Sequence, residues 1–340
     1  MPLSRVWVVP GEGGKYSRFC LGYAGDNTVQ GGVNEKGLWL DSFSVEAKPV
    51  AASPGKTVQS DMHDKIMAEC ATLEEVVALL RRYNNPFLSD NMLMVGDRTG
   101  ASAIIEGNAV LPRRGPYQII TNFRQSEHPN GSEVCGRYKI AEAMLKADPH
   151  VSVDGMRKIL AAVHQEGSVP TIYSYICDLR NGKLYLYHFH NFENVVVLDV
   201  AKELEKGAHV YDITEMFPKT VAAMTFDYLA RKELADKKAA RLDHRVDAAT
   251  FPQYSGRYRV TAPEVMAGQT ITISAGQSQL YLQLNDSGKW EVLPDSPASF
   301  FLLGYGGTDL SCRFARDATE RVTALAMEGA GLSLAATKVE

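Results

Sequence analysis

Gln30-Gly31-Gly32-Val33-Asn34-Glu35-Lys36-Gly37-Leu38 is the most informative stretch of this 340-residue chain. Glycines placed before a strand usually form a tight turn, and Asn34-Glu35-Lys36-Gly37 is compatible with one. Strand patterns lie on both sides, at residues 18–23 and 37–43. No helix follows to present its amino-terminal N–H groups, so the glycines do not cradle a phosphate. Taken alone, the stretch predicts a turn within a sheet.

Outward from this turn, apolar spacing predicts strands and helices in separate runs. Helices are expected at 61–71, 73–83, 136–146, 153–165 and 215–244, and strands at 6–9, 91–96, 101–106, 117–121, 172–178, 183–189 and 195–200. Thr72-Leu73-Glu74-Glu75 fits a capping box, and Ser152 fits a helix N-cap. Because strands and helices do not alternate one by one, antiparallel sheets with segregated helices fit better than a repeated βαβ pattern.

The character of the chain changes after residue 249. Eight short strands are expected, at 256–260, 270–275, 279–283, 290–294, 299–303, 310–315, 322–328 and 332–337. Short strands at this spacing predict a small antiparallel barrel or sandwich. We therefore expect three parts: a domain over 1–215, a helical linker over 216–250 and a β domain over 251–340.

Composition excludes several classes of function. The 36 basic and 40 acidic side chains leave a formal charge of −4, whereas nucleic-acid binding needs a basic excess. No stretch approaches the ~18 apolar residues of a membrane span, and the amino terminus lacks the features of a signal peptide. Five scattered cysteines indicate neither a disulfide framework nor a zinc site. A reduced, cytoplasmic chain without a cofactor is expected, and a homo-oligomer is left open.

Four residues could carry chemistry on the evidence of their own positions. Asn122 ends a predicted strand, where its amide could form a turn or donate to a developing oxyanion. Arg137 opens a predicted helix against the helix dipole, which slightly favours a specific anionic partner, although a surface ion pair remains the default interpretation. Asp97 and Glu106 could serve in acid–base chemistry, although a hairpin turn also explains Asp97.

Histidines and cysteines give weaker signals. His188 and His190 are expected on one face of a strand and could share a metal ion. No third ligand is evident, so hydrogen-bonded or solvent-facing histidines are the preferred interpretation, and no metal site is predicted. Buried, inert thiols are expected for the cysteines; Cys20 is the thiol considered as a relocated nucleophile, although a strand cysteine lacks an adjacent base.

Several segments, taken in order, resemble one family. They are Gly31-Gly32-Val33-Asn34-Glu35-Lys36-Gly37-Leu38, Glu69-Cys70-Ala71-Thr72-Leu73-Glu74-Glu75, Asp97-Arg98-Thr99-Gly100 through Glu106, Ile120-Thr121-Asn122-Phe123, Cys135-Gly136-Arg137-Tyr138 and Tyr173-Ser174-Tyr175-Ile176-Cys177-Asp178. Together they look like linear-amide hydrolases of the N-terminal nucleophile superfamily, which includes choloylglycine hydrolases, penicillin V acylases and isopenicillin-type acyltransferases. The resemblance covers roughly residues 5–215.

The resemblance implies a four-layer αββα sandwich, and an amino-terminal cysteine whose thiol attacks an amide carbonyl while its α-amino group acts as the base. By position, Asn122 corresponds to an oxyanion-hole or substrate-orienting asparagine, and Arg137 to the active-site arginine. Ser44 falls where relatives place a second polar donor, and Asn34 joins it as a substrate-binding residue. The expected ligand is a small-molecule acyl amide, with no nucleic acid or membrane as partner.

This sequence departs from the family at its start. Relatives begin with the nucleophilic cysteine and a Gly-Arg-Asn-x-Asp-like segment, and the matching region here begins after both. Removal of Met1 would expose Pro2, which carries no thiol. Two expectations follow: a truncated hydrolase or acyltransferase that lacks its nucleophile and first strand, exported if a signal segment precedes it, or a non-catalytic binding protein of the same fold.

The last part of the chain resembles a second, accessory type of domain. Tyr254-Ser255-Gly256-Arg257-Tyr258, Leu280-Tyr281-Leu282-Gln283 and Pro294-Asp295-Ser296-Pro297 look like the small β domain appended to some serine β-lactamase-like hydrolases. We therefore expect a lipocalin-like antiparallel barrel over 251–340, with a role in shaping substrate access.

Overall fold

A computed structural model describes the chain over residues 4–23, 29–59, 61–148, 152–167, 170–241, 247–263, 266–276, 279–284, 289–296, 299–302, 309–329 and 332–339. The chain forms two compact units, one of Leu3–Tyr23 with Val29–Pro218 and one built around Lys219–Glu340. No helix in the described part of the chain is long and apolar enough to cross a membrane.

Two antiparallel sheets form the centre of the amino-terminal unit. The larger has eight strands in the order β11-β1-β2-β3-β4-β5-β6-β7, and the smaller has three in the order β10-β9-β8. The bounds are β1 (Ser4–Val9), β2 (Arg18–Tyr23), β3 (Val29–Asn34), β4 (Trp39–Ser44), β5 (Asn91–Gly96), β6 (Ser102–Glu106), β7 (Ala109–Pro112), β8 (Tyr173–Asp178), β9 (Lys183–His188), β10 (Asn191–Asp199) and β11 (His209–Asp212).

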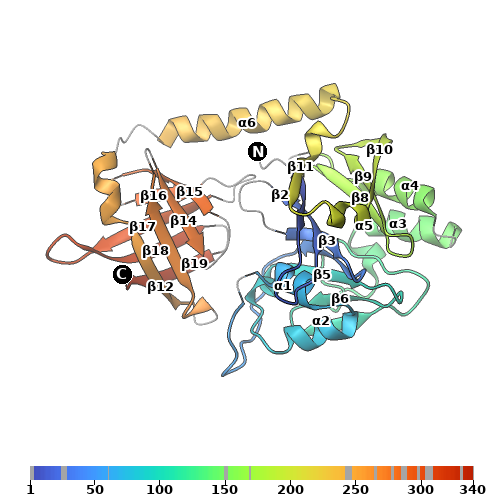
Figure 1. Cartoon of the computed structure of the whole chain (residues 1–340), viewed down its shortest axis with the longest axis horizontal. Helices are drawn as coiled ribbons and strands as arrows, with labels where there is room; N and C mark the ends of the chain where they lie inside the picture. Colours follow the sequence, from blue (N-terminus) through green and yellow to red (C-terminus); the bar gives the residue numbers. More distant parts are fainter. Residues whose placement is uncertain are drawn as a thin grey trace. The chain divides into compact units, whose positions relative to one another are not determined.

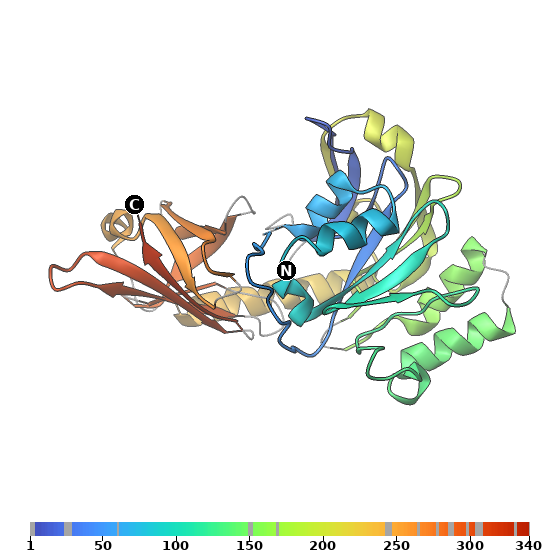
Figure 2. The same cartoon turned by 90° about the horizontal axis from the view of Figure 1, so that it is seen from below.

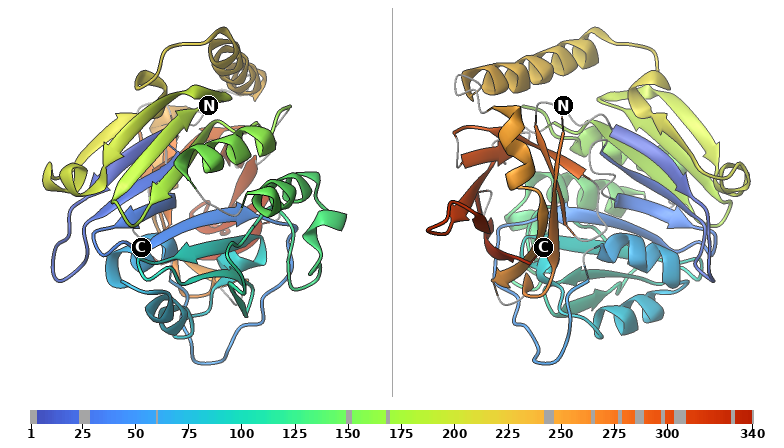
Figure 3. Two further views of the ribbon diagram at one scale, coloured as in Figure 1. Left: turned by 90° about the vertical axis from the view of Figure 1, so that its right-hand side faces the viewer. Right: turned by 60° about the vertical axis from the view of Figure 1, so that its left-hand side comes forward.

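Helices cover the outer faces of these sheets (Figure 1). Their bounds are α1 (Met62–Glu69), α2 (Leu73–Leu80), α3 (Gly136–Ala147), α4 (Val153–Val163) and α5 (Val200–Glu205), with short 3-10 turns at Pro86–Ser89, Gly131–Glu133 and Ile213–Glu215. Helices α1 and α2 pack on the larger sheet, while α4 packs against β8 and carries α3 beside it. The order of layers is αββα, as the left view of Figure 3 shows.

Helices α2 and α4 begin where the sequence predicts. Thr72 accepts a hydrogen bond from the Glu75 backbone N–H at 3.2 Å and caps α2. Ser152 accepts from the Gly155 N–H at 3.0 Å and caps α4. Each cap satisfies an N–H group that has no partner inside its own helix, so these local interactions determine where the helices start.

Alternating side chains on the larger sheet build two separate cores. Leu40, Leu93 and Val95 face outward and pack under α1 and α2 in a fully buried cluster. Phe19 and Val33 face inward and pack against leucines and valines of β9 and β10. The period of two along each strand therefore separates the helix-facing core from the core between the sheets.

Gly31 and Gly32 lie inside strand β3 and not in the turn that the sequence predicts. A Cβ on Gly31 would lie 2.5 Å from the Tyr175 hydroxyl and 2.9 Å from Asp41 Oδ1, and a Cβ on Gly32 would meet the Phe19 carbonyl. Both glycines are needed because other groups approach the backbone closely. The turn itself is confirmed at residues 35–37, where Gly37 has a φ of 80°.

Three further expectations about local structure are wrong. Residues 117–121 run without strand pairing, whereas the edge strand β7 forms just before them. His188 ends β9, but Phe189 and His190 form the following turn, so the two histidines do not share a strand face. The long charged helix, α6 (Val221–Arg241), begins six residues later than expected, and residues 242–244 of that expectation lie outside the described residues.

The carboxy-terminal unit is a closed antiparallel barrel of eight strands that follows α6 and a 3-10 segment at Ala248–Gln253 (Figure 2). Its strands are β12 (Gly256–Ala262), β13 (Thr270–Ala275), β14 (Leu280–Leu284), β15 (Lys289–Pro294), β16 (Ser299–Leu302), β17 (Leu310–Arg316), β18 (Val322–Gly329) and β19 (Leu332–Lys338). All eight strands predicted from the sequence are present.

Aromatic side chains fill the barrel. Phe300 and Phe314 pack edge to face at 5.4 Å, and Tyr254 lies 4.9 Å from each of them. The buried Tyr258 hydroxyl donates to the Tyr254 carbonyl at 2.6 Å, which satisfies its polar end. The interior of the barrel is therefore a packed hydrophobic core.

Substitution of Gly31 tests the close approach between the two sheets. Gly31→Ala should lower the free energy of unfolding by about 1–3 kcal/mol, because a methyl group must displace Tyr175 or Asp41 from a packed layer. Urea unfolding monitored by tryptophan fluorescence measures this. Gly115→Ala is the matched control, since no atom lies within 4 Å of a Cβ at that position. Equal stability of the two variants would contradict the packing described here.

Candidate functional site

Three of the four residues that the family resemblance assigns to the site meet at one end of β4, and only Asn34 lies apart from them. The Asn122 side-chain amide donates to the Ser44 carbonyl oxygen at 2.7 Å, and Arg137 Nη2 donates to Asn122 Oδ1 at 2.7 Å. Ser44 ends β4, Asn122 lies in the loop before the Gly131–Glu133 turn, and Arg137 lies in the first turn of α3. The three residues, termed the polar cluster below, link segments that are 78 and 15 residues apart.

Buried charged side chains hold the loop that carries Asn122. Arg124, which is 8% exposed, donates from Nη2 to the Ser89 carbonyl at 2.5 Å. The Glu106 carboxylate accepts the backbone N–H groups of Gln125 at 2.9 Å and Ser126 at 2.6 Å. Glu106 thus anchors the loop and is not free for the acid–base role considered from the sequence. The loop is tied to β6, so the position of Asn122 is determined by the sheet.

The hydrogen-bonding groups of the Asn122 side chain are only partly used. An amide NH₂ group has two donors, and one of them is used on Ser44. Asn122 itself is exposed and Arg137 is half-buried. The remaining donor and the guanidinium group are therefore available to a carbonyl or carboxylate oxygen, which is the chemistry expected of this pair.

Cys135 lies beside the polar cluster as the N-cap of α3. Partial burial acts to raise the pKa of its thiol. The Thr121 hydroxyl, the backbone N–H groups of Tyr138 and Arg137 and the Arg137 charge near the sulfur outweigh that effect, so the pKa is lowered. Such a thiol has more thiolate at neutral pH than an ordinary cysteine. The sequence analysis predicts an inert thiol here, and the available signal against that prediction is the arginine in the first turn of the helix that follows.

The other four thiols have the opposite character. Burial raises the pKa values of Cys70, Cys177 and Cys312 to about 12. Cys20 is fully buried on β2, and burial raises its pKa further still. These properties argue against Cys20 as a relocated nucleophile, because its thiol is buried and stays protonated at neutral pH.

The inner face of β4 leads from the polar cluster into the space between the sheets. Trp39, Asp41 and Phe43 on this face are half-buried, whereas Leu40 on the outer face is fully buried. Trp39 Nε1 donates to the Tyr175 hydroxyl at 3.0 Å. Burial raises the pKa of Asp41 to about 7, although hydrogen bonds from the Ser42 N–H and from Tyr175 act to lower it. Asp41 can therefore exchange a proton near neutral pH.

Asn34 lies elsewhere. In the antiparallel β3–β4 pair, Gly31 is opposite Asp41, so Asn34 and Ser44 lie at opposite ends of the hairpin. The Asn34 amide donates to the Met67 and Cys70 carbonyls at 2.8 and 2.7 Å, and its Oδ1 accepts the Lys36 and Leu38 N–H groups at 3.0 Å. Its side chain is committed to holding the turn against α1, and we leave it out of the site.

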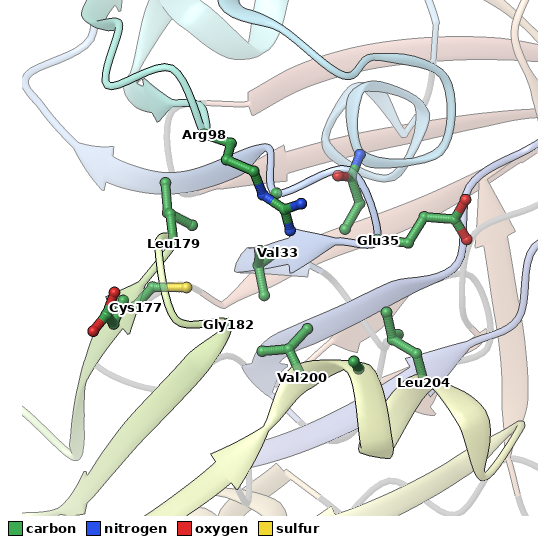
Figure 4. Close-up of a pocket in the computed structure, with 12 residues that line it drawn as sticks. Val33, Glu35, Arg98, Cys177, Leu179, Gly182, Val200 and Leu204 are labelled. Carbon is green, nitrogen blue, oxygen red and sulfur yellow. The ribbon is translucent and has the colours of Figure 1, made fainter.

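A pocket of about 220 Å³ lies at the Asn34 end of the hairpin (Figure 4). Val33, Val200 and Leu204 supply apolar walls, and the Arg98 guanidinium and the Cys177 sulfur point toward Val33. Apart from Asn34, no residue predicted to bind substrate lines it. This pocket is therefore distinct from the polar cluster.

The remaining candidates have structural roles. Asp97 accepts hydrogen bonds from the Leu73 N–H at 3.0 Å and the Thr99 N–H at 2.9 Å, so it joins the β5–β6 turn to α2. His188 stacks on Phe217 with ring centroids 5.7 Å apart. Neither residue has a free group directed at the polar cluster.

Similarity to known proteins is detected only at the level of structure. No protein-family model matches the chain, and no curated protein does. Among solved structures, a variant of conjugated bile acid hydrolase from Clostridium perfringens matches 64% of this chain and 92% of its own, with 16% identity and a TM-score of 0.52. The amino-terminal unit therefore shares its fold with that hydrolase. Penicillin V acylase from Agrobacterium tumefaciens matches 62% of this chain and 83% of its own, with 18% identity and a TM-score of 0.49.

This resemblance agrees with the αββα order of the amino-terminal unit, and the alignment covers less than the whole chain because the barrel follows that unit. At 16% identity, the match to the conjugated bile acid hydrolase establishes the fold and not the reaction. The chemistry of this chain therefore depends on its own residues, and first on the polar cluster.

Alkylation tests the environment of Cys135. At pH 7, iodoacetamide should modify Cys135 before the other four cysteines, because only its thiol pKa is lowered among the cysteine shifts described above. Peptide mapping by mass spectrometry identifies the first labelled residue. Arg137→Ala should slow that labelling several-fold, and Arg81→Ala on α2 should not. First labelling of any other cysteine would contradict this assignment.

Asp41 should make stability depend on pH. The fold raises its pKa to about 7, above an unfolded value of about 3.9, so the folded state favours the neutral form. The stability contribution of Asp41 is largest below about pH 4 and is lost as pH rises to about 7. Asp41→Asn should therefore stabilise the protein at pH 8 by about 1 kcal/mol, or roughly 2–4 °C in Tm, with no gain near pH 4.

Thermal unfolding at both pH values measures this difference. Glu193→Gln, at an exposed carboxylate on β10, is the matched control. A gain from Asp41→Asn that is the same at pH 4 and pH 8 would show that the carboxyl group does not titrate in this way.

Proposed function

We propose that this protein acts on the linear C–N amide bond of an acylated small molecule, which it binds at the polar cluster of Ser44, Asn122 and Arg137. The hydrogen-bonded series from Arg137 to Asn122 to Ser44 is the observation that carries the proposal. It joins three residues that were selected on sequence alone, from three separate elements. The amide hydrolases with this fold support the same reaction class as an analogy.

In this proposal each residue has a distinct task. The free amide hydrogen of Asn122 donates to the substrate carbonyl oxygen, where negative charge develops during attack on the amide. Arg137 holds Asn122 in place through Oδ1 and attracts a carboxylate on the substrate. Ser44 fixes the other side of the Asn122 amide through its carbonyl oxygen. Hydrolysis would consume one water molecule and release a carboxylic acid and an amine.

Apolar surface next to the polar cluster suits the acyl part of such a substrate. Phe43 on β4 and Met94 on β5 lie on the inner face of the sheet and are half-buried. Both pack at the margin of a small cluster centred on Met92, Ile104 and Ile120. Burial of an acyl chain there would contribute about 25 cal/mol per Å² of apolar area.

A second candidate is ligand binding without cleavage. It is favoured by the thiols: burial raises the pKa of four of the five cysteines, which leaves Cys135 as the described thiol with thiolate character. The polar groups and the charge around Cys135 lower the pKa of its thiol, and a thiolate stabilised in this way is a weaker nucleophile. The same cluster would then hold an acyl amide, or its carboxylate product, without turnover.

Binding and turnover should be measured together with penicillin V and a glycine-conjugated bile acid as probes. Calorimetric titration should show one site per chain, and Arg137→Ala should weaken binding at least tenfold, or about 1.4 kcal/mol. Asn122→Ala should have a comparable effect. Arg81→Ala, on the helix that covers the opposite face of the larger sheet, is the matched control and should bind normally.

Product formation distinguishes the two candidate functions, hydrolysis and ligand binding without cleavage. Release of amine that Asn122→Ala and Cys135→Ser both abolish would support hydrolysis with Cys135 as the nucleophile. Binding without release of amine would support the second candidate. Absence of binding, or binding that Arg137→Ala leaves unchanged, would contradict both.

A further inference from the structure

Three side chains with metal-ligating atoms meet where α4 ends beside the turn between β9 and β10. His164 is the C-cap of α4, Glu166 follows two residues later, and His190 lies in the turn. One ligand atom from each lies within 4.8 Å of those of the other two. They come from two segments that are 24 residues apart along the chain, and the fold brings them together at the outer layer, away from the polar cluster.

His164 is already oriented as a metal ligand. Its Nδ1 lies 2.6 Å from the Ala161 carbonyl oxygen, so Nδ1 carries a proton and donates it. In the neutral ring this leaves a lone pair on Nε2. Nε2 lies 3.2 Å from Glu166 Oε1, which also carries lone pairs. Two acceptors at this distance need a positive charge between them, either a proton or a cation.

His190 supplies a second free nitrogen. Its ring lies 4.3 Å from that of His164, with 41° between their planes. Nε2 of His190 is buried and has no hydrogen-bond partner among the residues that the structure describes. The ring also makes a backbone hydrogen bond with Gln165, the residue between His164 and Glu166. A buried nitrogen without a partner is unfavourable unless something else occupies that position.

The surroundings hold His190 in place. The Phe189 ring stacks on it at 4.1 Å with 14° between the planes. Phe189 has a φ of 52°, a left-handed conformation that a non-glycine residue adopts only when its neighbours enforce it. Its backbone N–H donates to the Ile172 carbonyl at 2.8 Å. The turn therefore directs His190 at His164 at some cost in backbone strain.

We propose that His164, Glu166 and His190 bind one divalent transition-metal ion of the zinc class. Two imidazole nitrogens and one carboxylate oxygen are a ligand set that zinc accepts, and a water molecule would complete four-coordination. Ligands of one tetrahedral zinc ion lie about 3.3 Å apart. The His164–Glu166 separation of 3.2 Å already fits this, and the His190 nitrogen, within 4.8 Å of the other two ligand atoms, must move closer when the ion binds.

The ion would join the end of α4 to the β9–β10 turn. Glu166 is 76% exposed, so the ion can enter from solvent, while the His164 side chain is 19% exposed. Because the three ligands come together only in the folded chain, metal binding stabilises the fold. This inference does not depend on the proposed action on amides, and its failure would leave that proposal unchanged.

Cobalt binding to the full chain, stripped with a chelator and free of any polyhistidine tag, tests the proposal. One equivalent of Co²⁺ should produce the strong visible absorption of a tetrahedral site, and Zn²⁺ should displace it. His190→Gln and His164→Gln should each weaken binding at least tenfold. His188→Gln is the matched control, because His188 stacks on Phe217 outside the cluster and should bind Co²⁺ as the unmodified chain does.

Glu166→Gln keeps the test valid if the histidine variants fail to fold, because Glu166 is exposed and its replacement should preserve the fold while weakening the metal site. Zn²⁺ should also raise the Tm of the unmodified chain and not that of Glu166→Gln. No bound Co²⁺, an octahedral spectrum, or equal binding by the unmodified chain and by all three variants would overturn the proposal. In that case the His164–Glu166 contact is an ordinary ion pair that holds a proton.

Discussion

The close approach of Tyr175 to Gly31 determines the geometry of the amino-terminal unit. Tyr175 projects from the smaller sheet until its hydroxyl reaches the backbone of the larger one, where only a residue without a side chain leaves room. The same hydroxyl accepts a hydrogen bond from Trp39 and contacts Asp41. One contact thus sets the separation of the sheets and the environment of the only carboxyl group described here whose pKa is raised to near neutrality.

The position of the polar cluster follows from this packing in two steps. Strand β4 is held between β3 and β5, so its last residue, Ser44, is fixed relative to the sheet. The loop that carries Asn122 is then anchored to β6 by Glu106 and to the Pro86–Ser89 turn by Arg124. Only Arg137 comes from outside the sheet, on α3, and its charge also acts on Cys135. The cluster therefore combines two rigid supports with one helix terminus, an arrangement suited to orienting an oxygen atom.

Sequence patterns were informative where structure is local. The barrel strands alternate over short distances between clear turns, and helices α2 and α4 are capped directly by the side chains of Thr72 and Ser152.

Sequence patterns failed where a group that is distant in the sequence decides the local structure. In sequence, Gly31 is typical of a turn, but in the structure it lies in a strand because the Tyr175 hydroxyl approaches its backbone closely. Residues 117–121 have strand character, but in the described structure they pair with no strand. Asn34 and Asn122 are equally plausible in sequence. Their roles separate only because the backbone of α1 occupies the hydrogen-bonding groups of the first. The sequence likewise did not reveal His164 and Glu166 as neighbours of His190, since His164 is 26 residues from His190 along the chain.

Closure of the carboxy-terminal barrel has a topological consequence. Its first and last strands, β12 and β19, pair side by side, with Tyr258 opposite Lys338. The first and last residues of the barrel therefore lie on adjacent strands. Every other pair of neighbouring strands is joined by a connecting segment, and only β19 and β12 are paired without one. A circular permutant that joins β19 to β12 and opens another hairpin would keep all eight strand pairings. The barrel can thus be inserted into a host protein, or moved within its own chain, without the loss of any strand ladder.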